Sequence, residues 1–197
     1  LDGAGIPRAV EATVYNQEGA IEKAKTVCYP LVMKVVGPIH KSDVGGVVLN
    51  IKDEKQMLTE FDRMMKIPET NAILMQPMLS GTELFVGAKY EDKFGHMVLC
   101  GLGGIFIEVL KDVQYGLSPI CKTEALDMIR GLKSYKIIEG VRGQQPIDEK
   151  KFADILVRLS ALLQAAPEII ELDLNPLLAV GKKIIAVDAR INIQKPL

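Results

Sequence analysis

The chain has 197 residues, 48 % of them hydrophobic, and its 24 basic and 25 acidic side chains nearly cancel. This composition allows a real apolar core and argues against a wholly disordered protein. Because the charges are balanced and interspersed, a nucleic-acid-binding or membrane-surface protein is not expected. No apolar run approaches the roughly 18 residues that span a bilayer.

The cysteine pattern bears on the compartment. Cys28, Cys100 and Cys121 are odd in number and widely spaced, and they form no metal-binding pattern. We therefore expect buried, reduced thiols and a cytoplasmic location.

The first half of the chain predicts a helix followed by a β-loop-β-α-β arrangement. Asn16 is a plausible cap for the first helix, and the stretch Asp53–Gln56 carries a capping-box signature for the second. Residues 38–45 form the loop that separates the first two strands. The expected elements are a helix over 16–28, strands over 31–36 and 46–51, a helix from 53, and a strand over 71–78.

The second half predicts an antiparallel strand pair, then helices, then a closing set of strands. A tight polar turn joins the first pair, and a regular apolar stripe marks the last helix. The expected elements are strands over 82–90 and 96–102, helices over 122–132 and 148–165, and strands over 169–174, 177–180 and 183–191. Helices and strands do not alternate strictly, so the predicted class is α+β, with subdomains over 1–78 and 79–197.

Lys34 is unusual because it interrupts the apolar run LVMKVV. Inside a strand buried on both faces, its ammonium group would need an anionic partner. The alternative is a lysine on an edge strand that reaches into water, and spacing alone does not decide between the two.

The loop PIHKSDVGGV combines several polar residue types that a plain turn does not need. His40 has an imidazole whose pKa lies near working pH, which suits a nucleophile. Gly45 and Gly46 allow close approach of the backbone to a phosphate, and Lys41 adds positive charge. The alternative is a solvated connecting loop with an incidental histidine.

A set of oxygen-bearing side chains lies near the C-terminus. Asp173 and Asn175 share one face of a predicted strand with Glu171, and Asp188 follows on the next strand of a hairpin. Counting from the turn at Gly181 places Asp188 opposite Asp173 or Asn175. Such a set suits Mg²⁺ bound to a polyphosphate, and the alternative is an ordinary exposed face.

Taken in order, these stretches resemble the ATP-grasp domain of ADP-forming acyl-CoA synthetases, which is related to the β subunit of succinate–CoA ligase. The resemblance extends from about Gly5 to Ile193. It is carried by the stretches GIP, YPLVMKVVGPIHKSDVGGV, ILMQPMLSGTELFVGAKYEDKFG, GLGGIFIEVLKDV, GVRG, ELDLNPLLAV and AVDARI. It implies an ATP-grasp fold with nucleotide bound between two α+β subdomains.

The resemblance also implies roles for residues that bind ATP or ADP. Lys34 corresponds to the lysine at the α and β phosphates. The adenine is expected near Gln76 and Met78, and Glu83 near the ribose or phosphates. Lys41, Gly45 and Gly46 belong to the phosphate-binding loop.

The remaining implied roles concern the metal and the phosphoryl transfer. Asp173, Asn175 and Asp188 correspond to Mg²⁺ ligands. His40 matches the histidine that passes phosphate to ADP, and Arg142 matches an arginine near the phosphates.

The implied reaction is carboxylate + CoA + ATP ⇌ acyl-CoA + ADP + phosphate. It needs CoA-binding and ligase domains that this chain lacks, either in the same polypeptide or in a separate α subunit, so we expect the chain to be one domain of a larger protein or complex. The alternatives are another ATP-grasp carboxylate ligase and a regulatory module fused to a protein acetyltransferase.

Overall fold

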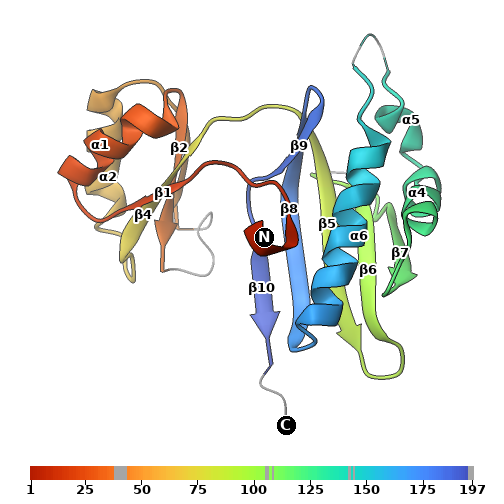
Figure 1. The fold of residues 1–197 in the computed structure, drawn as a ribbon. Coiled ribbons are helices and arrows are strands. Elements are labelled where there is room, and N and C mark those ends of the chain that lie inside the picture. Colours follow the sequence, from red (N-terminus) through yellow and green to blue (C-terminus); the bar gives the residue numbers. More distant parts are fainter. Residues whose placement is uncertain (38–43, 105–106, 108, 142, 144, 195–197) are drawn as a thin grey trace. The chain divides into compact units, whose positions relative to one another are not determined.

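The computed structural model describes residues 1–37, 44–104, 107, 109–141, 143 and 145–194 (Figure 1). The chain divides into two compact units, a smaller unit of Ala9–Leu79 and a larger unit of Leu1–Arg8 with Ser80–Leu197. No helix in the described ranges is long and apolar enough to span a bilayer.

The smaller unit is a four-stranded sheet with two helices on one face. The strand order is β1-β4-β2-β3, and the described pairings in this sheet are antiparallel. Its core is formed by the inward faces of both helices and by the side chains of all four strands that face them. The elements are β1 (Ala12–Val14), α1 (Gln17–Val27), β2 (Leu31–Val36), β3 (Val47–Ile51), α2 (Glu54–Met64) and β4 (Ala72–Pro77).

Both helices of the smaller unit begin where the sequence predicts. The Asn16 side chain accepts a hydrogen bond from the Gly19 backbone N–H at 2.8 Å. The Asp53 side chain accepts one from the Gln56 N–H, also at 2.8 Å. Each cap satisfies one of the backbone donors that a helix leaves unpaired in its first turn.

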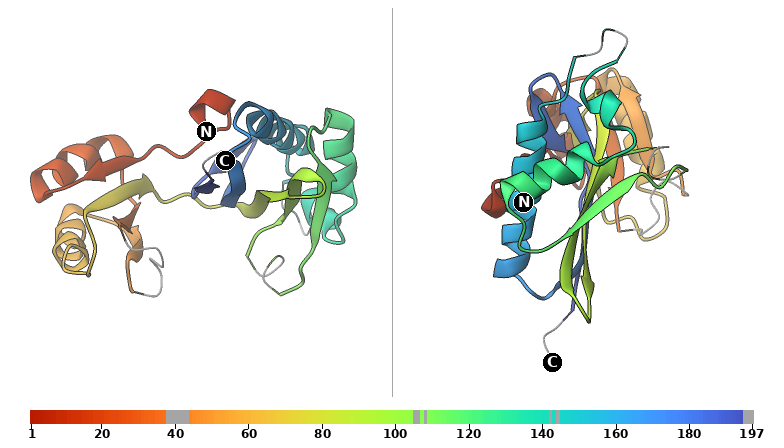
Figure 2. Two further views of the ribbon diagram at one scale, coloured as in Figure 1. Left: turned by 90° about the horizontal axis from the view of Figure 1, so that it is seen from below. Right: turned by 90° about the vertical axis from the view of Figure 1, so that its right-hand side faces the viewer.

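The larger unit is built on a long antiparallel sheet in the order β10-β8-β5-β6-β7, with β9 also paired to β8. Helices α4 and α6 lie over one face of this sheet (Figures 1 and 2). The elements are the 3₁₀ turn η1 (Asp2–Ala4), β5 (Thr82–Glu91), β6 (Gly95–Leu102), β7 (Val113–Leu117), α4 (Lys122–Arg130), α5 (Tyr135–Ile138), α6 (Glu149–Ala165), β8 (Ile169–Val180), β9 (Lys183–Ala186) and β10 (Arg190–Ile193).

The two faces of the larger sheet differ in character. Alternate residues of β5, β6 and β8 are fully buried against α4 and α6, among them Leu84, Val86, Leu172 and Leu174. The residues between them, including Asp173, point to the face that these helices leave uncovered. We call this second face the open face of the larger sheet.

Residues 1–8 belong to the larger unit, whereas the sequence analysis assigned residues 1–78 to one subdomain. Ile6 is only 1 % exposed and packs in the core of the larger unit. The Ala186 N–H donates to the Pro7 carbonyl oxygen at 2.9 Å, and Arg8 forms a parallel bridge with Ala186. Sequence periodicity does not reveal this contact, because the two partners are almost a whole chain apart.

The C-terminal strands differ from the expected ones. The two strands expected over 169–174 and 177–180 form one continuous strand, β8, which passes through Pro176. The single strand expected over 183–191 is instead divided into β9 and β10. Pro176 has no N–H to donate to a neighbouring strand, yet its carbonyl still accepts from Val187.

Two smaller expectations also change. Cys100 is buried, but Cys28 and Cys121 are exposed, and all three thiols are free. Strand β7, which was not predicted, extends the sheet beyond β6. His96 lies within the predicted strand, and its buried ring contacts the Ile169 carbonyl oxygen.

Candidate nucleotide and metal site

Lys34 lies on an inner strand. Strand β2 is paired with β4 on one side and β3 on the other, so the alternative of an edge-strand lysine is wrong. Its neighbours Met33 and Val35 are fully buried under the helices, while Lys34 is half-buried and points to the opposite face. A cation in the middle of a sheet is costly unless anionic groups compensate it.

Gly45 and Gly46 precede β3. Gly45 has a φ of 67°, which glycine adopts without strain, and its carbonyl accepts from Arg63 Nη2 at 3.1 Å. The Gly46 carbonyl accepts from the Val35 N–H at 2.8 Å. The end of this loop is thereby fixed to both β2 and α2.

Gln76 and Met78 lie at the end of β4 and just beyond it. Gln76 is 2 % exposed, and its Nε2 donates to Glu11 Oε2 at 3.1 Å. The Met78 N–H donates to the Pro30 carbonyl oxygen at 2.8 Å. The first bond holds the Gln76 side chain and the second fixes the backbone of the segment in which the adenine was expected.

Glu83, near the start of β5, lies against two glycines at the end of β6. The Gly103 N–H donates to the Glu83 carbonyl oxygen at 2.8 Å. A Cβ atom added at Gly104 would come within 2.9 Å of Glu83 Oε2, and one at Gly103 within 3.0 Å of Glu83 Cβ. The glycine pair therefore leaves room for the Glu83 side chain, a relationship that no spacing rule indicated.

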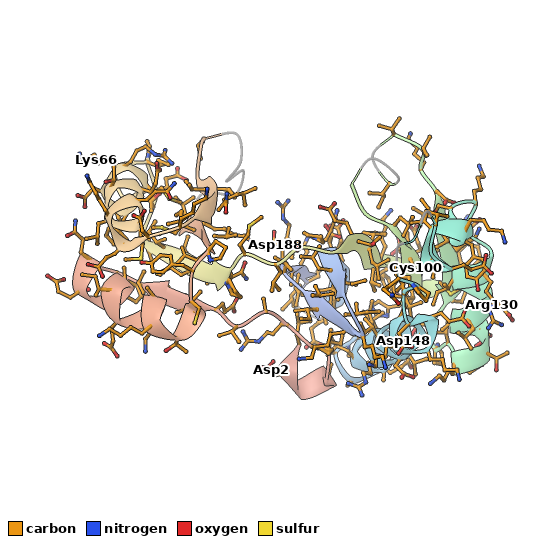
Figure 3. The ribbon with its side chains drawn as sticks, turned by 90° about the horizontal axis from the view of Figure 1, so that it is seen from above. Asp2, Lys66, Cys100, Arg130, Asp148 and Asp188 are labelled. Atoms are coloured by element: carbon orange, nitrogen blue, oxygen red, sulfur yellow. The ribbon has the colours of Figure 1, made fainter. Side chains whose placement is uncertain are left out.

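The carboxylates and amide of the expected metal site are brought to one part of the larger sheet. Asp173 and Asn175 lie two residues apart on β8, and both are half-buried. The Val187 N–H donates to the Pro176 carbonyl oxygen at 3.0 Å, which places Asp188 beside Asn175 at the break between β9 and β10. Figure 3 labels Asp188 at this break.

Asp173 has the electrostatic character of a ligand. Burial raises the pKa of its carboxyl group, Arg190 opposes that shift, and the charges of Asp188 and Glu171 add to it. Its Oδ1 atom is buried and has no hydrogen-bond partner among the residues that the structure describes. A buried carboxylate oxygen without a donor is expected to bind a cation or a ligand proton.

This donor set fits Mg²⁺. Among the described His, Cys, Asp and Glu residues no three gather to hold a metal, so the third ligand would be the amide oxygen of Asn175. Oxygen donors from two carboxylates and an amide suit a hard cation that keeps several waters or phosphate oxygens of its own.

Two neighbours of Asp173 were missed by the sequence analysis. Arg190 of β10 and Gly87 of β5 lie directly opposite Asp173 on its two sides. A Cβ at Gly87 would come within 2.8 Å of Phe85 Cζ, so the Phe85 ring lies over this glycine. Only the strand register reveals these neighbours, and the register was not available from the sequence.

Three expected site residues, His40, Lys41 and Arg142, lie outside the described residues. Their implied roles stay predictions.

The comparisons with known proteins agree over almost the whole chain. The ATP-grasp domain family matches residues 1–193. The chain is 41 % identical over 197 residues to acetate–CoA ligase [ADP-forming] I subunit beta of Pyrococcus furiosus, covering 95 % of this chain and 85 % of that subunit. It is 40 % identical to acetate–CoA ligase [ADP-forming] I of Archaeoglobus fulgidus, covering 97 % of this chain but only 29 % of that longer protein.

Solved structures lead to the same family. The dinucleotide-forming acetyl-coenzyme A synthetase 1 of Ca. Korarchaeum cryptofilum, in complex with coenzyme A, Ca-AMPCP and HgCl⁺, matches with a TM-score of 0.94 and 34 % identity, over 98 % of this chain and 89 % of that one. A second structure of that protein, with coenzyme A and Mg-AMPPCP, matches with a TM-score of 0.87 and 34 % identity, over 98 % and 88 %. The predicted α+β ATP-grasp fold is thereby confirmed, and the chain belongs to the ATP-grasp domain family that includes the β subunits of ADP-forming acetate–CoA ligases.

Proposed function

We propose that this chain is the nucleotide-binding and phosphoryl-transfer part of an ADP-forming acyl-CoA synthetase. The reaction is carboxylate + CoA + ATP ⇌ acyl-CoA + ADP + phosphate. The main support is the 41 % identity to an acetate–CoA ligase β subunit over 85 % of that subunit. Phosphoryl transfer depends on positioning and charge neutralisation, and both units of this chain contribute groups for those tasks.

In the smaller unit, Lys34 is the phosphate-binding cation. Its place on an inner strand, half-buried and on the face opposite the helices, supports this role. Gly45 and Gly46, with Lys41, approach the phosphates. Gln76 and Met78 bind the base through the fixed backbone at the end of β4.

In the larger unit, Asp173, Asn175 and Asp188 hold Mg²⁺, and Glu83 binds near the ribose or phosphates. The metal neutralises charge on the polyphosphate and orients it. The buried Oδ1 of Asp173, which has no donor among the described residues, is the observation that carries this assignment.

His40 is the phosphate carrier in this proposal, and Arg142 lies near the phosphates. An imidazole nitrogen attacks phosphorus, the P–O bond to the donor breaks, and a P–N bond forms. In the next step an oxygen of ADP attacks the same phosphorus and the P–N bond breaks. The imidazole leaves in its neutral form, with one proton on the ring. Both residues rest on the family resemblance.

The acyl group and CoA would be bound by partner domains, either in the same polypeptide or in an α subunit. The named subunit beta among the relatives supports a partner of this kind. The free thiols of Cys28, Cys100 and Cys121 support a reducing, cytoplasmic setting.

Nucleotide binding tests the proposal directly. In isothermal titration of the complete protein with Mg·ADP, Lys34→Ala and Asp173→Asn are each expected to weaken binding by about 10- to 100-fold, as loss of a charged contact does. Lys66→Ala, an exposed lysine of the smaller unit, serves as the control. Wild-type protein that binds no adenine nucleotide would refute the proposal.

Labelling tests the histidine relay separately. With γ-labelled ATP, the wild-type protein is expected to acquire acid-labile, base-stable phosphate, and His40→Ala is expected to acquire none. If His40→Ala became labelled as the wild type does, the phosphate carrier would be another residue. Exchange of label between ADP and ATP should fall in parallel.

A further inference from the structure

Arg190 stands apart from the other arginines of this protein. It is the first residue of β10, it is exposed, and its side chain makes no hydrogen bond or ion pair with any residue in the described ranges. The other arginines that the structure describes each donate to a carboxylate or a carbonyl oxygen, namely Arg8, Arg63, Arg130 and Arg158.

The position of Arg190 is set by the sheet. In the β10–β8 pairing Arg190 lies directly opposite Asp173, so both side chains project from the open face of the larger sheet. Among the described residues, no salt bridge joins the two groups.

The Arg190 guanidinium and the Asp173 Oδ1 atom are thus neighbours, and neither has a hydrogen-bond or ion-pair partner in the part of the chain that the structure describes. If Arg190 served only to neutralise Asp173, direct pairing would be expected, because cross-strand neighbours are within reach of long side chains. The arrangement instead suits a ligand that carries both charges, with a metal ion for Asp173 and a phosphate oxygen for Arg190. Arginine also presents paired N–H donors that match two phosphate oxygens.

We propose that Arg190 is a phosphate-binding residue for the metal-bound polyphosphate of the nucleotide. This inference rests on the proposed function and adds a residue to its site. Asp173 binds the cation, and the guanidinium beside it binds an oxygen of the same metal–nucleotide complex. Because of Arg190, the protein binds the metal–nucleotide complex more tightly than the metal ion alone.

The proposal predicts that loss of Arg190 weakens nucleotide binding but not metal binding, so the two affinities are measured separately. In the complete protein, Arg190→Ala is expected to weaken Mg·ADP binding by about 10- to 100-fold in isothermal titration, because a charge-assisted hydrogen bond is lost. Binding of Mn²⁺ alone, followed by electron paramagnetic resonance, is expected to stay equal or become tighter, since a nearby positive charge has been removed. The unfolding temperature should not fall, because Arg190 bonds to no described side chain.

Matched variants sharpen the comparison. Arg190→Lys keeps the charge but loses the paired donors, so its Mg·ADP affinity should lie between those of wild type and Arg190→Ala. Lys89→Ala removes another exposed cation from the same sheet, one already paired with Glu91 at 2.7 Å, and should bind Mg·ADP as the wild type does. Asp173→Asn should lose Mn²⁺ binding.

The outcomes are distinct. If wild type binds Mg·ADP and Arg190→Ala binds it within twofold of wild type, this inference fails and the proposed function stands. If Arg190→Ala loses Mn²⁺ and Mg·ADP to the same extent, Arg190 acts only by positioning Asp173, and phosphate binding is refuted. If wild type binds no Mg·ADP, the proposed function and this inference fail together.

Discussion

Gly87 of β5 lies directly opposite Asp173 of β8, and the place that a side chain would occupy at Gly87 is filled by the ring of Phe85. An aromatic ring beside the half-buried carboxylate reduces its access to water, in keeping with burial as the main cause of its raised pKa. The glycine therefore shapes the surroundings of Asp173, the proposed metal ligand, without a side chain of its own.

Substitution of Gly87 is expected to be mild for stability. In Gly87→Ala the new Cβ meets the far end of the Phe85 ring, which can swing aside. In Gly101→Ala the Cβ would come within 2.6 Å of the Asp112 carbonyl oxygen, a backbone atom next to β7 that cannot swing aside as a side chain can. We expect Gly101→Ala to cost about 1–3 kcal/mol of unfolding free energy and Gly87→Ala clearly less, as measured by urea denaturation. Equal losses would mean that the Phe85 ring cannot move.

Asp112 predicts a dependence of stability on acid. Burial acts to raise the pKa of this carboxyl, but hydrogen bonds from the Ser134 side chain and from the Ser134 and Lys133 backbone N–H groups outweigh it, and the net pKa is lowered. A carboxyl with a lowered pKa stabilises the fold above its unfolded-state pKa, and this stabilisation is lost as pH falls through the folded-state pKa.

Asp112→Asn should therefore cost about 1–3 kcal/mol at pH 7, because a charged acceptor of several hydrogen bonds is replaced by a neutral one. The difference from wild type should begin to shrink as the pH falls below the ordinary aspartate pKa of about 3.9, because the unfolded chain then takes up a proton before the folded one does. Urea unfolding at pH 7, 5 and 3.5 measures both effects. A difference that stays constant over this range would show that the charge of Asp112 is not what matters.

The three thiols should differ in reactivity. Burial raises the pKa of Cys100 to about 12, and the nearby charge of Asp112 adds to the shift, while Cys28 and Cys121 are exposed. Since the thiolate is the reactive form, a disulfide reagent at pH 8 should label Cys28 and Cys121 in the folded protein and all three cysteines after denaturation. Rapid labelling of Cys100 in the native protein would contradict its buried position, which Figure 3 shows inside the larger unit.

The helix cap at Asn16 gives a test within the smaller unit. Asn16→Ala removes the acceptor of the Gly19 N–H and should lower the unfolding free energy by about 1 kcal/mol. Asn16→Asp keeps an acceptor at the same place and adds a charge that favours a helix N-terminus, so it should retain the stability of wild type. Thermal or urea unfolding distinguishes the two variants.

Local elements were largely predictable from the sequence. Helices α1, α2 and α6 carry apolar stripes and polar caps, so their type and approximate limits follow from periodicity. The alternation around Asp173 is equally local, since Leu172 and Leu174 are buried on one face while Asp173 lies on the other. Helix caps, apolar stripes and strand alternation all depend on residues that are only a few positions apart, so they can be read directly from the sequence.

Long-range register was not predictable. The opposition of Arg190 and Asp173, the ring of Phe85 over Gly87, and the place of Ile6 in the larger core all depend on which strands become neighbours. The break between β9 and β10 was missed because its residues, Val187–Ala189, contain no glycine or proline to mark a turn. Strand β7 was missed although Val113, Tyr115 and Leu117 alternate along it, because it is short and follows a glycine-rich stretch that favours a loop.

The order of the chain in the two units has a consequence for biosynthesis. Because Ala9–Leu79 is inserted between two segments of the larger unit, a ribosome releases the whole smaller unit while the larger one is still incomplete. Arg8 precedes the smaller unit in the chain, yet it reaches its bridge with Ala186 only after β9 has emerged. A nascent chain arrested before β9 should therefore contain a folded insert within a host whose segment before Ala9 is not yet docked, which is the stage at which a chaperone would engage it.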